Sequence, residues 1–137
     1  MLKIVIQTTV KSSIEKVWAA WTTPEDINHW NAASDDWHNP RSTNDLRAGG
    51  KFSHRMEAKD GSFGFDFEGT YTNVKHGKLI EYVLGDGRTV SVAFESADEV
   101  IRVVEAFDAE DSNSAEMQRK GWQSILDRFG SYVEANN

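Results

Sequence analysis

The chain has 137 residues, a usual length for one domain, and its 39% of hydrophobic residues are enough for one core. Its formal net charge of -7 argues against a nucleic-acid partner, because such proteins present a basic face to the phosphates. The absence of cysteine excludes disulfides, thiolate zinc sites and a cysteine nucleophile. We expect one domain spanning residues 1–137.

The start of the chain lacks the long apolar region of a signal peptide. No run of about 18 apolar residues, the length that a transmembrane helix needs, follows anywhere. We therefore expect a cytoplasmic protein that does not insert into a membrane.

The first elements predicted are a strand and a short helix. β-Branched and polar residues alternate over Lys3–Val10, which is typical of a half-buried strand. Ser12 and Glu15 have the spacing of a capping box. Apolar residues then recur at helical steps up to Trp21, so a helix with one buried face should follow the strand.

A second short helix and a loop come next. Thr23 is suited to a cap and Pro24 to the first helical position, which predicts a helix ending near Trp30. Residues 31–50 are rich in Asn, Asp, Ser, Gly and Ala. We expect this segment to be mostly loop.

The middle of the chain has the pattern of an antiparallel meander. Asp-Gly pairs at 60–61 and 86–87 separate alternating runs, a strong hairpin signal because both positions tolerate positive φ. His76-Gly77 and Ala97-Asp98 mark the other two turns. The predicted strands are residues 51–58, 63–74, 78–84, 88–96 and 99–107.

One long amphipathic helix is predicted to close the chain. Asn113, with Glu116 three residues later, is suited to its N-cap. Apolar and small residues then recur at steps of three and four, namely Met117, Gly121, Trp122, Ile125, Leu126, Phe129, Tyr132 and Val133.

The sheet and the helix must bury their apolar faces on each other, which predicts a two-layer α+β domain. Strand parity indicates which side chains point inward. One face collects Phe52, Met56 and Ala58 with His54 in phase, then Phe63, Phe65, Phe67 and Tyr71, then Val90, Val92 and Phe94.

Four motifs in this order resemble those of one known family. They are the segment 17–27 followed by Trp30, the segment Asp45-Leu46-Arg47-Ala48-Gly49-Gly50-Lys51-Phe52, the triplet Gly69-Thr70-Tyr71, and Gly121-Trp122 with Leu126 four residues later. Together they run almost from end to end. The chain thus resembles the activator of heat-shock protein 90 ATPase homologue family, within the START-like superfamily (SRPBCC, polyketide-cyclase-like).

The resemblance implies a helix-grip fold, in which a curved antiparallel sheet wraps around the long C-terminal helix and two short helices follow the first strand. The superfamily includes lipid carriers, hormone receptors, cyclases and oxygenase components, so the fold alone does not assign an activity. In the eukaryotic co-chaperone this domain is joined to another domain. The 137 residues do not include a second domain, so we expect no stimulation of a chaperone ATPase by this chain alone.

The enclosed space between sheet and helix is the expected ligand site, because small molecules bind in concave apolar cavities with a few polar groups. Aromatic side chains equally serve to fill a core, so a packed interior is the alternative. The predicted lining is Trp30, Trp37, Arg47, Phe52, His54, Met56, Phe65, Phe67, Tyr71, Glu105, Trp122, Ile125 and Phe129.

Three polar members of this set have alternative interpretations. His54 either faces a ligand or satisfies a neighbouring group. Glu105 alternates with apolar residues and points either inward, which would raise its pKa, or to the outer face of the strand. Arg47 either holds an anionic ligand group or pairs with Asp35, Asp36 or Asp45 to anchor its loop.

No residue pattern indicates catalysis or metal binding. The four histidines lack metal-ligand spacing, and no serine has the context of a nucleophile elbow. We expect no cofactor and a monomer or weak dimer. The leading hypothesis is non-catalytic binding of a small hydrophobic or aromatic molecule. The alternatives are a protein-interaction module, and a cyclase or hydrolase that uses His54 and an inward acid.

Overall fold

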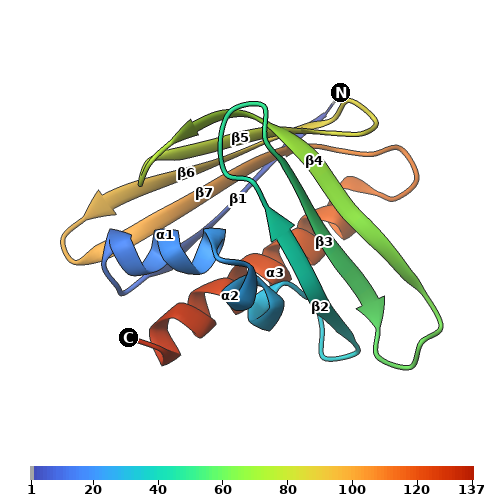
Figure 1. Cartoon of the computed structure of the whole chain (residues 1–137), viewed down its shortest axis with the longest axis horizontal. Helices are drawn as coiled ribbons and strands as arrows, with labels where there is room; N and C mark the ends of the chain where they lie inside the picture. Colours follow the sequence, from blue (N-terminus) through green and yellow to red (C-terminus); the bar gives the residue numbers. More distant parts are fainter. Residues whose placement is uncertain (1) are drawn as a thin grey trace.

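The computed structural model describes residues 2–137, which form three helices and one antiparallel sheet of seven strands (Figure 1). The strands are β1 (Lys3–Val10), β2 (Trp37–Asn44), β3 (Lys51–Ala58), β4 (Gly64–Lys75), β5 (Leu79–Leu84), β6 (Thr89–Ala97) and β7 (Val100–Asp108). The helices are α1 (Ile14–Thr22), α2 (Pro24–Trp30) and α3 (Ala115–Ala135). None of the helices in residues 2–137 is both long and apolar enough to cross a membrane.

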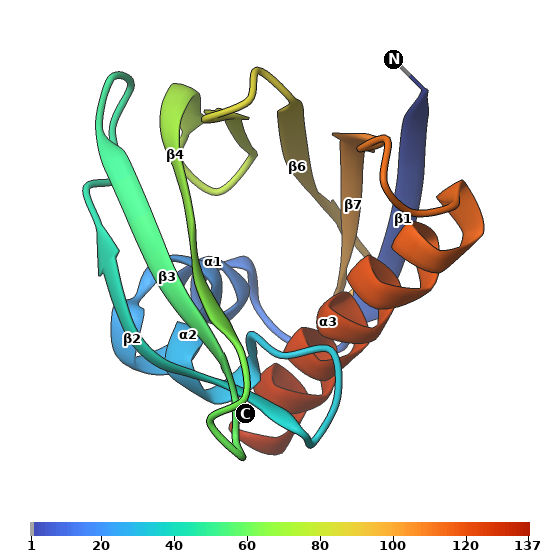
Figure 2. The same ribbon diagram turned by 90° about the vertical axis from the view of Figure 1, so that its right-hand side faces the viewer.

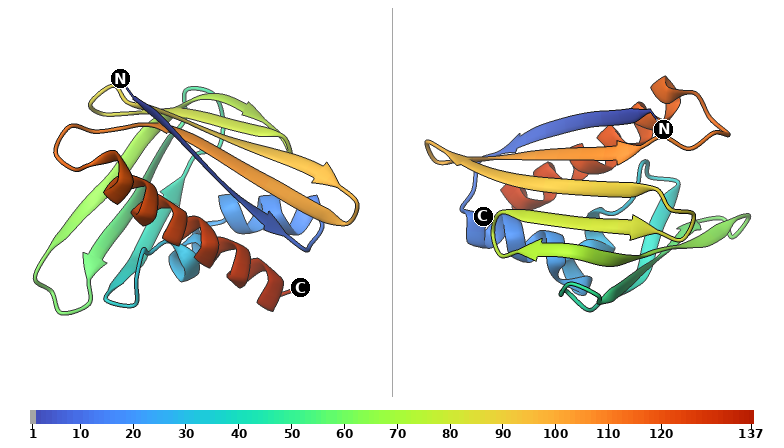
Figure 3. Two further views of the ribbon diagram at one scale, coloured as in Figure 1. Left: turned by 180° about the vertical axis from the view of Figure 1, so that it is seen from behind. Right: turned by 90° about the horizontal axis from the view of Figure 1, so that it is seen from above.

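The sheet follows the order β1-β7-β6-β5-β4-β3-β2 and curls around α3 (Figure 2). A helix lies along each edge strand, because α3 runs along β1 and α2 lies against β2. Helices α1 and α2 lie on the concave side of the sheet, beside the C-terminal half of α3 (Figure 3). This arrangement confirms the predicted α+β helix-grip fold.

Both predicted N-caps are wrong by one residue. Ser13, not Ser12, caps α1, and its Oγ accepts a hydrogen bond from the backbone N–H of Lys16 at 3.3 Å. Ser114, not Asn113, caps α3 in the same way. Two candidate capping residues stand side by side in both cases, and the sequence does not show which one leaves the extended conformation first.

The junction of α1 and α2 is close to its prediction. Thr23 ends α1 and precedes α2, with Pro24 in the first turn of the second helix. The Thr23 side chain makes no capping hydrogen bond, so its extended backbone and the proline that follows separate the two helices.

Strand β2 was not predicted: it lies at Trp37–Asn44 within the segment 31–50 that was expected to be mostly loop. Asn39 and Pro40 are poor strand formers, but β2 is an edge strand, and its register shifts between His38 and Arg41 around the proline. The buried Asn39 amide donates to the Arg41 carbonyl oxygen at 2.8 Å. Pairing with β3 and contact with α2 therefore stabilise a strand that local propensity does not predict.

The meander agrees with its predicted bounds to within one residue at each end. In the turns before β4, β5 and β6 the glycine alone takes positive φ, at Gly61, Gly77 and Gly87, and not the residue before it. The turn between β6 and β7 instead places Asp98 and Glu99 at φ 40 and 68. Two successive left-handed residues are the geometry of a type I′ hairpin.

The Gly49-Gly50 pair permits a close backbone approach before β3, as its sequence context indicates. A Cβ on Gly50 would lie 2.0 Å from the carbonyl oxygen of Asp45, and Gly49 has φ +86. Backbone hydrogen bonds of 2.8 and 2.9 Å join this loop to Tyr71 on β4. Larger residues would therefore displace the start of β3.

The core contact between α3 and the short helices is aromatic. Phe129 is fully buried, and its ring centroid lies 4.9 Å from those of both Trp21 and Trp30 in edge-on arrangements. One turn further along, the Tyr132 hydroxyl donates to Asp26 at 2.5 Å. These contacts fix the position of α1 and α2 beneath the sheet.

Side chains of α3 also cover the free edge of β1. Arg119 donates to the carbonyl oxygen of Val5 at 2.8 Å, and Gln123 donates to that of Gln7 at 3.0 Å. Unpaired carbonyl groups on an edge strand otherwise invite pairing with another chain. The helix therefore stabilises the edge as well as the core.

We predict that Phe129→Ala lowers the free energy of unfolding by about 3–5 kcal/mol, the range for removing a large buried aromatic side chain. The matched control is Met117→Ala on the same helix. The periodicity predicts Met117 on the buried face, but it is 62% exposed, so its replacement should change stability by less than about 0.5 kcal/mol. Urea denaturation measures both values, and equal effects would contradict the assigned helix face.

Candidate functional site

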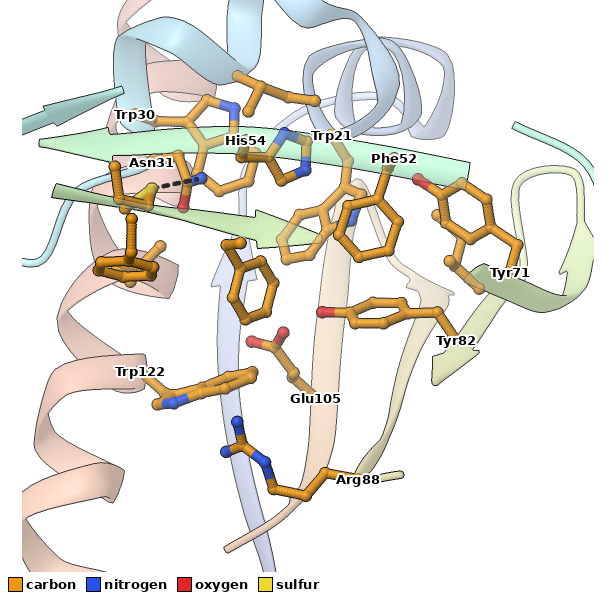
Figure 4. A pocket seen from close by; sticks show the side chains of 16 residues that line it. Trp21, Trp30, Asn31, Phe52, His54, Tyr71, Tyr82, Arg88, Glu105 and Trp122 are labelled. Atoms are coloured by element: carbon orange, nitrogen blue, oxygen red, sulfur yellow. Dashed lines mark hydrogen bonds between the residues drawn. The ribbon is translucent and has the colours of Figure 1, made fainter. Parts of the chain in front are cut away.

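A pocket of about 290 Å³ lies between the concave face of the sheet and α3 (Figure 4). The strands supply most of the wall, and α1, α2 and α3 supply the rest. Its lining consists of Trp21, Ile27, Trp30, Asn31, Phe52, His54, Met56, Phe65, Phe67, Tyr71, Ile80, Tyr82, Arg88, Glu105, Trp122 and Ile125.

Most residues predicted from strand parity and helical spacing line this pocket. They are Trp30, Phe52, His54, Met56, Phe65, Phe67, Tyr71, Glu105, Trp122 and Ile125. Strand parity succeeds here because the sheet is continuous, so side chains of equal phase on neighbouring strands meet on one face. Glu105 takes the inward orientation of its two alternatives, since it is 6% exposed between buried Val103 and Phe107.

Three predicted lining residues lie elsewhere. Phe129 fills the core between the helices and does not reach the pocket. Trp37 packs beside Phe65, with ring centroids 6.1 Å apart, but does not line the cavity. Arg47 is exposed and its Nε donates to Asp45 at 2.9 Å, which is the loop-anchoring alternative.

The sequence-based prediction omitted Trp21, Ile27, Asn31, Ile80, Tyr82 and Arg88. Ile80 and Tyr82 could have been found, because they stand on either side of the polar Glu81 and share one parity of a predicted strand. Trp21 was predicted on the buried face of α1 but not at the pocket. Asn31 and Arg88 lie at the end of a helix and next to a turn, where periodicity gives no orientation.

His54 lies on β3 with its ring 5.1 Å from that of Phe52. Its Nδ1 shares a hydrogen bond of 3.0 Å with the hydroxyl of Ser42 on β2. Burial lowers the pKa of His54 to about 4, so the imidazole is neutral at physiological pH. His54 thus presents a neutral polar edge rather than a charge to the pocket.

Glu105 and Tyr82 form a second polar region at another part of the wall (Figure 4). Burial raises the pKa of Glu105 to about 8. Burial, together with the nearby Glu105, raises the pKa of the Tyr82 hydroxyl well above its usual value. At neutral pH both groups are therefore mainly in their protonated forms.

Neither the Glu105 carboxyl nor the Tyr82 hydroxyl takes part in a hydrogen bond within residues 2–137. Every fully enclosed polar side-chain atom in this part of the chain does have a partner. The oxygens of Glu105 and Tyr82 thus lack a partner in the described part of the protein, and they are not fully enclosed because they border the pocket. These oxygens are therefore free to bond to a molecule that enters the pocket.

Three other polar side chains of the lining have partners within the protein. The Tyr71 hydroxyl donates to Asn44 at 2.6 Å. Asn31 donates to Asn39 at 2.8 Å. The Arg88 Nε donates to Asp86 at 2.7 Å, so this guanidinium is already part of an ion pair.

Among residues 2–137 no group of three or more His, Cys, Asp or Glu side chains is arranged to hold a metal ion. In Figure 4, His54 and Glu105 lie apart on different parts of the wall, and no hydrogen bond joins them within these residues. The site therefore contains two neutral polar regions within aromatic walls, His54 in one place and Tyr82 with Glu105 in another.

The family model of the Activator of Hsp90 ATPase homolog 1-like protein matches residues 11–134. The solution structure of the AHSA1-like protein from Aeromonas hydrophila is similar, with 50% identity, 98% of this chain and 94% of that chain covered, and a TM-score of 0.93. Chr148 from Cytophaga hutchinsonii is 49% identical over 98% of this chain and 93% of its own, with a TM-score of 0.85.

A more distant structure shares the fold alone. Protein NE0264 from Nitrosomonas europaea is 17% identical, with 99% of this chain and 96% of that chain covered and a TM-score of 0.86. No curated protein matches the chain. The curled sheet and long helix thus persist in proteins whose sequences differ at most positions.

We predict that Glu105 makes stability decrease with rising pH. Because the folded-state pKa is raised to about 8, the protonated carboxyl stabilises the fold fully below the unfolded pKa, and this contribution is lost as the pH rises through 8. Between pH 6.5 and 8.5 the wild type should lose about 2 kcal/mol, at about 1.4 kcal/mol per pH unit below the pKa.

Glu105→Gln should remove this loss, and thermal unfolding at the two pH values measures it. The control Glu68→Gln changes an exposed residue of β4 and should keep the wild-type pH dependence. A Glu105→Gln variant that still loses stability over this range would show that another group titrates.

Proposed function

Since this chain belongs to the family of Activator of Hsp90 ATPase homolog 1-like proteins, we propose that it binds a small aromatic or apolar molecule in the pocket between sheet and helix, without chemical conversion. One observation carries the proposal. The aromatic side chains of the interior leave a pocket of about 290 Å³ instead of filling it. START-like folds commonly bind ligands, which agrees with this interpretation.

The walls of the pocket suit a flat ligand. Phe67 and Trp122 stand edge to face with centroids 6.1 Å apart, and Trp122 in turn stacks on Phe107 at 3.9 Å. Rings that are already packed in this way present their faces and edges to a ligand. They lose little further conformational entropy when the ligand binds. Apolar burial contributes roughly 25 cal/mol per Å², and after the cost of association a micromolar dissociation constant is expected.

The size of the pocket limits the ligand to a small molecule. A cavity of roughly 150 Å³ is large enough to hold benzene. The pocket has about 290 Å³, which is room for a body of one or two rings. Phe65 is 42% exposed although it lines the pocket, so we place the entrance beside it, at the β3–β4 end.

The polar groups support binding rather than catalysis. A general acid or base must lie within hydrogen-bond reach of the reacting group and works best with a pKa near the operating pH. His54 is a neutral imidazole with a lowered pKa, and Glu105 is a carboxylic acid at neutral pH, so neither is poised as a strong base. Orientation of a ligand is the role that remains for them.

We predict that naphthalene, a two-ring hydrocarbon, binds with micromolar affinity and changes the tryptophan emission. Trp21, Trp30 and Trp122 line the pocket and would report binding, whereas Trp37 would contribute less than the sequence suggested. A fluorescence titration measures the affinity, and calorimetry verifies a stoichiometry of one. Absence of any saturable change would contradict the proposal.

Phe67→Ala should weaken naphthalene binding by about tenfold, because a ring of this size contributes on the order of 1–2 kcal/mol of contact. His54→Ala should also alter the affinity, by removing part of the wall. The matched control is Phe63→Ala, which removes a neighbouring phenylalanine that is 61% exposed and outside the pocket lining. Its affinity should equal that of the wild type.

A further inference from the structure

The Tyr82 and Glu105 side chains converge across one strand. Tyr82 on β5 pairs with Val90 of β6, and Glu105 on β7 pairs with Val92 of the same strand. Strand β6 thus lies between β5 and β7. The side chains of Tyr82 and Glu105 stand on either side of β6, and both line the pocket. Figure 4 shows the Tyr82 hydroxyl directed towards the Glu105 carboxyl.

We propose that Tyr82 and Glu105 act as a pair of O–H donors that selects ligands whose aromatic body carries an acceptor oxygen, in particular a carbonyl oxygen as in an aryl ketone. This inference rests on the proposed function and names the ligand class of the same site. It depends on geometry, because two side chains, 8% and 6% exposed, direct unpaired polar groups into one end of the pocket.

The protonation states support donation. Burial raises the pKa of the Glu105 carboxyl to about 8 and that of the Tyr82 hydroxyl still further, so at neutral pH each group holds a proton that it can donate. A carboxylic acid kept neutral by an apolar site, next to a tyrosine, is an established arrangement for binding a carbonyl or enolate oxygen.

The charges of the lining do not attract a cation. Arg88, which precedes β6, is the basic residue of the lining and is paired with Asp86. Glu105 is mainly protonated at neutral pH. The other titratable lining groups are His54 on β3 and Tyr71 on β4, both neutral at pH 7. The remaining neighbours of Glu105, from β1, β6 and α3, are Ile6, Val92 and Trp122, none of which titrates.

The experiment compares two ligands of the same shape. Methyl naphthyl ketone carries the acceptor oxygen, and isopropenylnaphthalene has a methylene group in its place. At pH 7 the wild type should bind the ketone at least about tenfold more tightly, since each ligand hydrogen bond to a neutral donor is worth up to about one factor of ten. Isothermal titration calorimetry measures both dissociation constants.

Two substitutions each remove one donor. Tyr82→Phe and Glu105→Leu should each weaken ketone binding by about tenfold and leave alkene binding within about twofold. Tyr132→Phe is the matched control, because its hydroxyl donates to Asp26 outside the pocket. Its ketone affinity should equal that of the wild type, and circular dichroism verifies that each variant is folded.

The pH dependence provides a second, independent measurement. The ketone affinity of the wild type should fall as the pH rises above about 8, because ionised Glu105 no longer donates. Glu105→Gln keeps a neutral N–H donor, so it should retain most of the ketone affinity at pH 7 and lose the dependence on pH. This result would separate a hydrogen-bonding role from a purely structural one.

Two outcomes would overturn the inference in different ways. If ketone and alkene bind equally well and the variants do not change their ratio, the donor pair has no role in selection, and the proposed ligand-binding function still holds. If neither compound binds, nor naphthalene, the proposed function fails together with the inference.

Discussion

The position of α3 along one edge of the curled sheet is the constraint on which the pocket depends. Phe129 packs against Trp21 and Trp30, which holds α1 and α2 against the same helix. Helix α2 in turn lies on β2, the opposite edge. Both edges of the sheet are thereby covered by helices, while the inner face between them is reached by single helix side chains such as Trp122, which stacks on Phe107 of β7. The pocket lies between the two edges, where β3, β4, β5 and β7 line it.

His54 and Glu105 are polar groups in the apolar environment of this pocket. Their ionisation makes the stability of the fold change with pH in opposite directions. The pKa of His54 is lowered to about 4, so its neutral form stabilises the fold above pH 6.5, and that contribution is lost as the pH falls towards 4. The pKa of Glu105 is raised to about 8, so its contribution is lost as the pH rises through that value. Between about pH 4.5 and 6.5 the two effects oppose each other, and above this range only Glu105 still changes stability.

The sequence predicted the meander and the inward phase of its strands, because alternation on paired strands is a local pattern with a direct structural meaning. The inward orientation of His54 and the option of an inward Glu105 came from this pattern. Strand β2 was missed because Asn39 and Pro40 have low strand propensity, and its stability comes from β3 and α2, which no local pattern contains. For Arg47 the sequence left two roles open, because a motif in a loop does not show which way its side chain points, and the structure has the pairing with Asp45.

Tyr71 and Tyr82 show why the unpaired groups carry information about the ligand. Both are buried tyrosines that line the same pocket. The Tyr71 hydroxyl has a partner in Asn44, so its burial is compensated within the protein. The Tyr82 hydroxyl has no such partner in the described chain, nor has Glu105 beside it. The oxygens of both side chains border the pocket instead of being fully enclosed, so a molecule in the pocket can bond to them. The unpaired Tyr82 and Glu105 oxygens therefore agree with the proposed binding role of the pocket.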